Sequence, residues 1–189
     1  MHTFDDNDVK IFGGSKIENE ADVLIRVVEI MKKQRANGNM DRAKDLGVKI
    51  ARQIYSPENI NAELADIIEK YKADEEVYEQ IKMLVTFVAE AQIHLLLEKY
   101  SVSTMTVNAL YDELIQLDDD LYDNITNAFT FYYLELRKGG DVSSHLGKRF
   151  AKLCGDGENE TLRELGSKLY NSINEIIKEE IDATNFVND

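Results

Sequence analysis

The sequence has one cysteine, one proline and no tryptophan among its 189 residues. A single cysteine, Cys154, excludes an intramolecular disulfide and a zinc site built from paired cysteines. Residues 1–14 lack the apolar segment of a signal peptide. No uncharged apolar run approaches the roughly 18 residues that a membrane-spanning helix needs. The sequence therefore predicts a soluble, cytoplasmic protein that needs no oxidising compartment.

Positive charge is also scarce, because 22 Lys and Arg stand against 36 Asp and Glu, a formal net charge of −14. This balance argues against a nucleic-acid-binding or anionic-membrane-binding protein, since binding to phosphates needs a positive surface. Hydrophobic residues make up 43% of the chain, which is enough for a packed core. We expect a flexible segment over residues 1–14 and a single helical domain over residues 15–189.

The apolar residues follow the 3.6-residue period of helices, and one proline with ten glycines favours long helices over strands. The predicted helices cover residues 15–36, 41–55, 56–71, 74–100, 104–117, 119–138, 142–154 and 159–181. The fold class is therefore all-α, with about eight helices in an antiparallel array or bundle. The 74–100 helix is apolar over most of its circumference, which predicts a central position.

An internal repeat is visible at an offset of 100 residues. Ala43, Gly47 and Ala51 are spaced four apart, and Ser143, Gly147 and Ala151 repeat this stripe of small residues. Glycine costs about 1 kcal/mol relative to alanine inside a helix, so its presence in both copies favours close helix packing. The related halves are residues 15–73 and 119–182. The alternative is a coincidence between two short helical segments.

The turn Gly38-Asn39-Met40-Asp41-Arg42-Ala43, followed by Ser56-Pro57-Glu58-Asn59, resembles a tetratricopeptide-like helical hairpin. The resemblance covers residues 23–59, with a fainter copy at 125–159. It implies a stack of antiparallel helix pairs that offers a groove to a peptide or a partner protein. No ligand-binding residue can be transferred from that family.

Three aspartates in the 119–123 segment match the DDxxD pattern that isoprenoid synthases use for magnesium and diphosphate: Asp119, Asp120 and Asp123. Carboxylates four residues apart on a helix can share a cation with phosphate oxygens. The alternative is an ordinary acidic first turn, because carboxylates there interact favourably with the positive end of the helix dipole.

Two further carboxylate pairs are similar to the ExxD and ExxE pairs of all-α nucleotide pyrophosphohydrolases: Glu63 with Asp66, and Glu76 with Glu79. Each pair lies one helical turn apart and suits magnesium. The alternative is a solvated acidic face. Glu90 and His94 form a third pair, for which we expect a half-buried histidine hydrogen-bonded to the glutamate.

Basic residues gather in both copies of the repeat. Residues 26–52 hold eight Lys or Arg against three Asp or Glu, and residues 137–152 hold five against one. The candidate partner-binding cations are Lys32, Lys33, Arg35, Arg137 and Lys138. The alternative is that they lie at helix C-termini and face the protein's own acidic helices. Phe131 and Tyr133 are candidates for an apolar groove or a dimer face, or for a second core face.

These observations predict a non-enzymatic, regulatory protein that binds a protein or peptide, with homo-oligomerisation left open. The sequence assigns no catalytic residue, metal ligand or cofactor. The alternative is a small all-α magnesium-dependent phosphohydrolase that uses the carboxylates Glu63, Asp66, Glu76 and Glu79.

Overall fold

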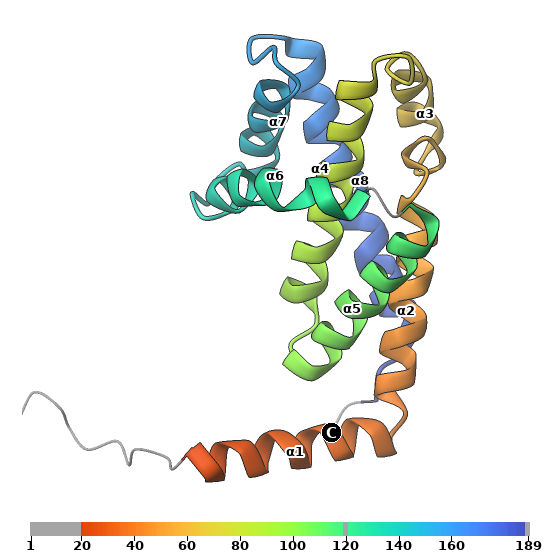
Figure 1. Cartoon of the computed structure of the whole chain (residues 1–189), viewed down its shortest axis with the longest axis vertical. Coiled ribbons are helices and arrows are strands. Elements are labelled where there is room, and N and C mark those ends of the chain that lie inside the picture. Colours follow the sequence, from red (N-terminus) through yellow and green to blue (C-terminus); the bar gives the residue numbers. More distant parts are fainter. Residues whose placement is uncertain (1–19, 119–120, 188–189) are drawn as a thin grey trace, which may run out of the picture.

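In a computed structural model, residues 20–118 and 121–187 are described (Figure 1). They form eight α-helices and one 3₁₀ turn, and within these ranges there is no strand. The elements are α1 (Glu20–Ala36), α2 (Asn39–Ile54), the 3₁₀ turn η1 (Pro57–Asn59), α3 (Ala62–Glu69), α4 (Glu75–Leu96), α5 (Tyr100–Leu117), α6 (Leu121–Leu136), α7 (Val142–Leu153) and α8 (Glu160–Thr184). The all-α prediction is confirmed. The predicted 1–14 segment lies outside the described residues.

None of the described helices combines the length and the apolar character that crossing a membrane requires.

Helix α4 is the centre of the fold, as its apolar circumference predicts. Every residue from Met83 to Ala89 is buried, and α8, α6, α5 and α2 all contact this helix (Figure 1). The Phe87 ring makes an edge-to-face contact with Phe129 of α6 at 5.3 Å and a tilted contact with Tyr132 at 5.1 Å. Such aromatic pairs add roughly 0.5–1.5 kcal/mol to the gain from burial alone.

The two glycine stripes lie inside close helix pairs, α2 with α5 and α7 with α8. A Cβ on Gly47 would lie 2.3 Å from the backbone oxygen of Thr106, and a Cβ on Gly147 would lie 2.3 Å from that of Arg163. Both distances are far below van der Waals contact. The small residues thus allow two helix backbones to approach more closely than a side chain would permit.

Several helix boundaries differ from the sequence prediction: α5 begins at Tyr100, four residues before the predicted start, and α8 ends at Thr184, three residues after the predicted end. The predicted 56–71 helix is divided, because Asn61 is extended and its side-chain oxygen accepts a hydrogen bond from the Leu64 amide at 2.8 Å, starting a new helix. The predicted 74–100 helix ends at Leu96. Leu97 is extended and only 8% exposed, so its side chain joins the core instead of continuing the helix.

Candidate functional site

Helix α1 carries an apolar surface that the rest of the described chain leaves uncovered. Its large aliphatic side chains are 46% to 65% exposed: Leu24, Ile25, Val27, Val28 and Ile30. Only α2 has an extended contact with α1 among the described elements, and Figure 1 shows α1 running across the end of the body. Contiguous apolar patches of this kind mark interaction sites in soluble proteins.

The direction of α1 is fixed by a polar elbow at its C-terminal end. Gln34 is fully buried, and its side-chain oxygen accepts a hydrogen bond from Nδ2 of Asn39 at 2.7 Å. The same Nδ2 donates to the backbone oxygen of Val187 at 2.9 Å, and the Val187 amide donates to Oδ1 of Asn39 at 2.9 Å. Gly38 makes the turn with φ at +77°. The bond between Asn39 and Gln34 joins α1 to α2, and the bonds to Val187 hold Asn39 in place.

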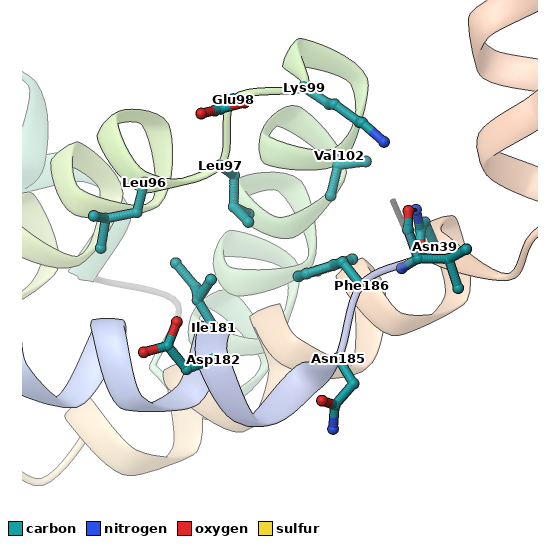
Figure 2. Close-up of a pocket in the computed structure, with 11 residues that line it drawn as sticks. Asn39, Leu96, Leu97, Glu98, Lys99, Val102, Ile181, Asp182, Asn185 and Phe186 are labelled. Carbon is teal, nitrogen blue, oxygen red and sulfur yellow. Dashed lines mark hydrogen bonds between the residues drawn. The ribbon is translucent and has the colours of Figure 1, made fainter. Parts of the chain in front are cut away.

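A pocket of about 460 Å³ opens beside the elbow, between the α4–α5 corner and the C-terminal residues. Figure 2 shows Leu97, Ile181 and Phe186 pointing into it. Glu98 and Asp182 are the acidic residues of its wall. The pocket thus has a mixed lining of apolar side chains, acids, amides and Lys99, next to the base of α1.

The predicted basic residues of α1 are at its C-terminal end. Lys32, Lys33 and Arg35 are all exposed, and Lys33 and Arg35 lie in the last turn. In the 24–36 segment, Glu29 is the single acid beside four cations. The C-terminal part of α1 is therefore positively charged within an acidic chain. A partner surface that combines apolar and acidic side chains would complement it.

Phe131 and Tyr133 are both about 40% exposed on α6, and each has a partner within the chain. The Phe131 ring lies 5.4 Å from the Arg149 guanidinium carbon. The Tyr133 ring meets Phe87 edge to face at 4.9 Å, and its hydroxyl donates to Oε1 of Glu90 at 2.6 Å. Burial, reinforced by the hydrogen bond to Glu90 and its negative charge, raises the pKa of Tyr133. Both aromatic residues thus contact the body of the protein as well as solvent.

The expected pair of Glu90 with His94 is wrong. His94 is exposed, and the Glu90 carboxylate instead accepts hydrogen bonds from the hydroxyls of Tyr111 and Tyr133. Helix α5 brings Tyr111 and helix α6 brings Tyr133 to this carboxylate. The partners of Glu90 are therefore set by the packing of three helices and not by residue spacing along α4.

Glu135 is the buried carboxylate of an ion-pair cluster at the end of α6. It is 5% exposed, and its Oε1 accepts hydrogen bonds from Nε of Arg149 at 3.0 Å and from Nη2 at 2.6 Å. Its Oε2 pairs with Lys138. Burial opposes ionisation of Glu135, but the hydrogen bonds from Lys138 and Arg149 outweigh it and lower its pKa. The predicted residue Lys138 therefore contacts the chain's own acid, whereas Arg137 is exposed.

The carboxylates of the magnesium hypotheses fall on several elements. Asp119 and Asp120 lie outside the described residues, as do the side chains of Glu63 and Asp123. Asp66 on α3 and Glu76 on α4 are exposed. Within the described part of the chain, no group of three or more His, Cys, Asp or Glu side chains is arranged to hold a metal ion.

Glu79 has a lysine as its partner. Nζ of Lys82 lies 2.5 Å from Oε1 of Glu79 and 3.3 Å from Oδ2 of Asp118, so one ammonium links α4 to the end of α5. Burial opposes the charge of Lys82, but the hydrogen bonds and charges of the two acids outweigh it and raise its pKa. Glu79 thus has a structural ion pair.

Compared with family models, curated proteins and solved structures, the chain has no match. The tetratricopeptide resemblance stays a prediction, and the helix contacts lend it no support, because α2 packs chiefly on α5. Sequence reasoning uses Leu24, Val27 and Val28 only as evidence of the 3.6-residue period of a helix. The signal it missed was Ile25 and Ile30, which widen the apolar surface beyond the stripe that one core contact requires.

Proposed function

We propose that this chain is a non-enzymatic protein-binding module and that α1 is its docking helix. The observation that carries the proposal is the run of half-exposed aliphatic side chains on a helix held away from the body. In proteins, most of the stability of a helix comes from packing of its apolar face. A partner protein that covers this face would provide the packing that the body does not.

The recognition mode is that of an amphipathic helix in an apolar groove, with anchors three and four residues apart. Leu24, Val27, Val28 and Met31 have that spacing. The cations Lys32, Lys33 and Arg35 then face acidic residues of the partner, which speeds encounter and selects the partner. The expected partner surface is an apolar groove with an acidic rim on another polypeptide.

The apolar area of α1 is too small to give tight binding by itself. Burying the exposed half of one aliphatic side chain contributes about 1 kcal/mol, so these side chains together give on the order of 5 kcal/mol. Association costs about 4–15 kcal/mol in lost translational and rotational freedom. A second contact area is therefore needed, and the pocket formed by Leu97, Ile181 and Phe186 lies beside the base of α1.

The test places a photo-crosslinking amino acid in the full chain, at Val28 on the apolar face or at Glu29 on the polar face of α1. We expect a discrete crosslinked partner from Val28 and at least tenfold less from Glu29. Leu24→Ser with Val28→Ser should reduce retention of that partner by at least tenfold, whereas Glu29→Ser should leave it unchanged.

The melting temperature separates lost binding from lost folding. Because Leu24 and Val28 are exposed, the double variant should melt within a few degrees of the parent protein. Equal crosslinking at the two positions, or full retention by the folded double variant, would contradict α1 as the docking helix.

A further inference from the structure

A second, smaller pocket lies at the junction of α6 and α7. Figure 1 shows these two helices on the side of the body, away from α1. The volume of the pocket is about 140 Å³. Its walls consist of four cations, one histidine and one carboxylate: Lys138, Lys148, Arg149, Lys152, His145 and Glu135. The proposed function makes no use of this pocket.

Helix α7 presents these residues on one face. His145, Lys148, Arg149 and Lys152 follow the i, i+3, i+4, i+7 spacing, so their side chains are neighbours on the helix surface. The helix from Val142 to Leu153 contains no acid, although the chain holds 36 Asp and Glu. Like charges four residues apart destabilise a helix by roughly 0.2–0.5 kcal/mol. An anion among them would remove that repulsion.

Several N–H groups of these cations remain available to donate to a ligand. In the described part of the chain, no acid forms an ion pair with Lys148 or Lys152. Glu135 accepts hydrogen bonds from Nε and Nη2 of Arg149. The other N–H groups of that guanidinium do not bond to Glu135 and can donate to a ligand. Nδ1 of His145 is buried and has no hydrogen-bond partner among the described residues.

The pocket is also built to keep its arginine in place. Glu135 holds one edge of the Arg149 guanidinium from α6, and the Phe131 ring, also from α6, lies near the same group. A buried carboxylate and an aromatic ring thus fix the orientation of a cation before any ligand arrives. Such preorganisation lowers the entropic cost of binding.

Size and charge select the ligand class. A cavity of about 140 Å³ is well above the roughly 10–15 Å³ that a cavity needs to hold one water, and it is smaller than the roughly 300 Å³ at which drug-sized pockets begin. A phosphate group carries a charge of about −1.5 to −2 at pH 7 and offers three strong acceptor oxygens. A carboxylate brings a single charge and two oxygens.

We propose that the α6–α7 pocket binds a phosphate dianion, free or as a small monoester, between Lys148, Lys152 and the Arg149 that Glu135 and Phe131 hold in place. This site is independent of docking through α1. It would give an acidic chain one phosphate-responsive position.

The test is a titration of the full chain with inorganic phosphate, O-phospho-L-serine or L-serine, followed by backbone amide NMR at low ionic strength and pH 7.5. We expect saturable shifts confined to α7 and the α6–α7 turn with both phosphates and none with L-serine. Tighter binding of O-phospho-L-serine by fivefold or more identifies a monoester as the ligand. Equal affinity identifies the free anion.

Two double variants that lose the same charge distinguish binding at this pocket from the general attraction of an anion to lysine side chains. Lys148→Gln with Lys152→Gln should weaken phosphate binding at least tenfold. Lys44→Gln with Lys178→Gln, which removes two exposed lysines from other helices, should leave it within twofold. Melting curves of both double variants confirm folding. Equal weakening in the two variants, or phosphate shifts spread over other helices, would overturn the proposal.

Discussion

The α2–α5 and α7–α8 helix pairs both pack closely at a glycine, but they join helices at different separations along the chain. Each contains a buried glycine, Gly47 or Gly147, at which a Cβ would collide with the backbone of the facing helix. In the second pair, α7 packs on the next helix in the chain. In the first pair, α2 packs on α5, with α3 and α4 between them in sequence. A stripe of small residues therefore specifies a close approach but not which helix approaches.

The two pairs also differ in polarity. Ser143 and Ser167 exchange hydrogen bonds across the second pair, because each hydroxyl donates to the other residue's backbone oxygen, at 3.2 Å and 3.0 Å. Ala43 stands at the equivalent position of the first pair and is fully buried. The α2–α5 pair instead has an ion pair between its helices, in which Nε of Arg52 donates to Oε1 of Glu113 at 2.7 Å. At the first position of the small-residue stripe, therefore, the α2–α5 pair is apolar and the α7–α8 pair has two hydrogen bonds.

The largest expected effect comes from filling the glycine positions. Gly47→Ala and Gly147→Ala should each lower the free energy of unfolding by about 2 kcal/mol, because overpacking costs roughly 1–3 kcal/mol and exceeds the gain in helix propensity. Urea denaturation measures both. Lys44→Ala and Lys148→Ala, on the exposed faces of the same helices, should stay within about 0.5 kcal/mol.

If only one of the two glycine variants is destabilised, the helix pairs are not equivalent and the internal repeat loses its physical basis.

A smaller effect tests the polar difference. Ser143→Ala should cost about 1 kcal/mol, the usual net value of one hydrogen bond. Ser144→Ala on the same helix should be nearly neutral, since among the described residues no hydrogen bond of its hydroxyl contributes to the contact. Equal costs for the two serines would remove the distinction between a polar and an apolar stripe of small residues.

The third prediction leaves stability unchanged and reports on local opening of the second pair. Burial, reinforced by the negative charge of Asp74, raises the pKa of Cys154 to about 12, so the reactive thiolate is scarce at pH 8. We expect alkylation by iodoacetamide to be about 100- to 1,000-fold slower in the folded protein than in urea.

Cys154 is the single cysteine of the chain, so the modified residue is unambiguous. Ser143→Ala should increase the folded-state rate if α7 separates from α8 more often. A folded rate equal to the unfolded rate would show that the end of α7 is open in solution.

Several helix boundaries were accessible to sequence reasoning because their signals are local. Asn37-Gly38 ends α1 at the predicted residue, and Gly139-Gly140 separates α6 from α7 with positive φ angles of +65° and +68°. The end of α4 was not accessible, because neither glycine nor proline marks Leu97. That helix stops where packing draws the Leu97 side chain into the core.

The candidate sites show the same division. Cationic residues near residues 32–35 and 137–152 are evident from composition. That Lys138 and Arg149 converge on the buried Glu135 is not, because the side chains come from two helices and meet only after folding. Likewise, the aliphatic residues of α1 have the pattern of a core helix, and only the fixed elbow at Asn39 places them in solvent.

By itself the sequence determined that this protein is helical, where most of its helices begin and end, and that two glycine stripes bring helices close together. These properties depend on periodicity, caps and side-chain size, which act within a few residues. Only the tertiary structure decided that α5 faces α2, that the other described elements leave the apolar side chains of α1 exposed, and that a positive pocket forms beside α7. Those outcomes depend on which distant surfaces bury one another, and no local pattern encodes that choice.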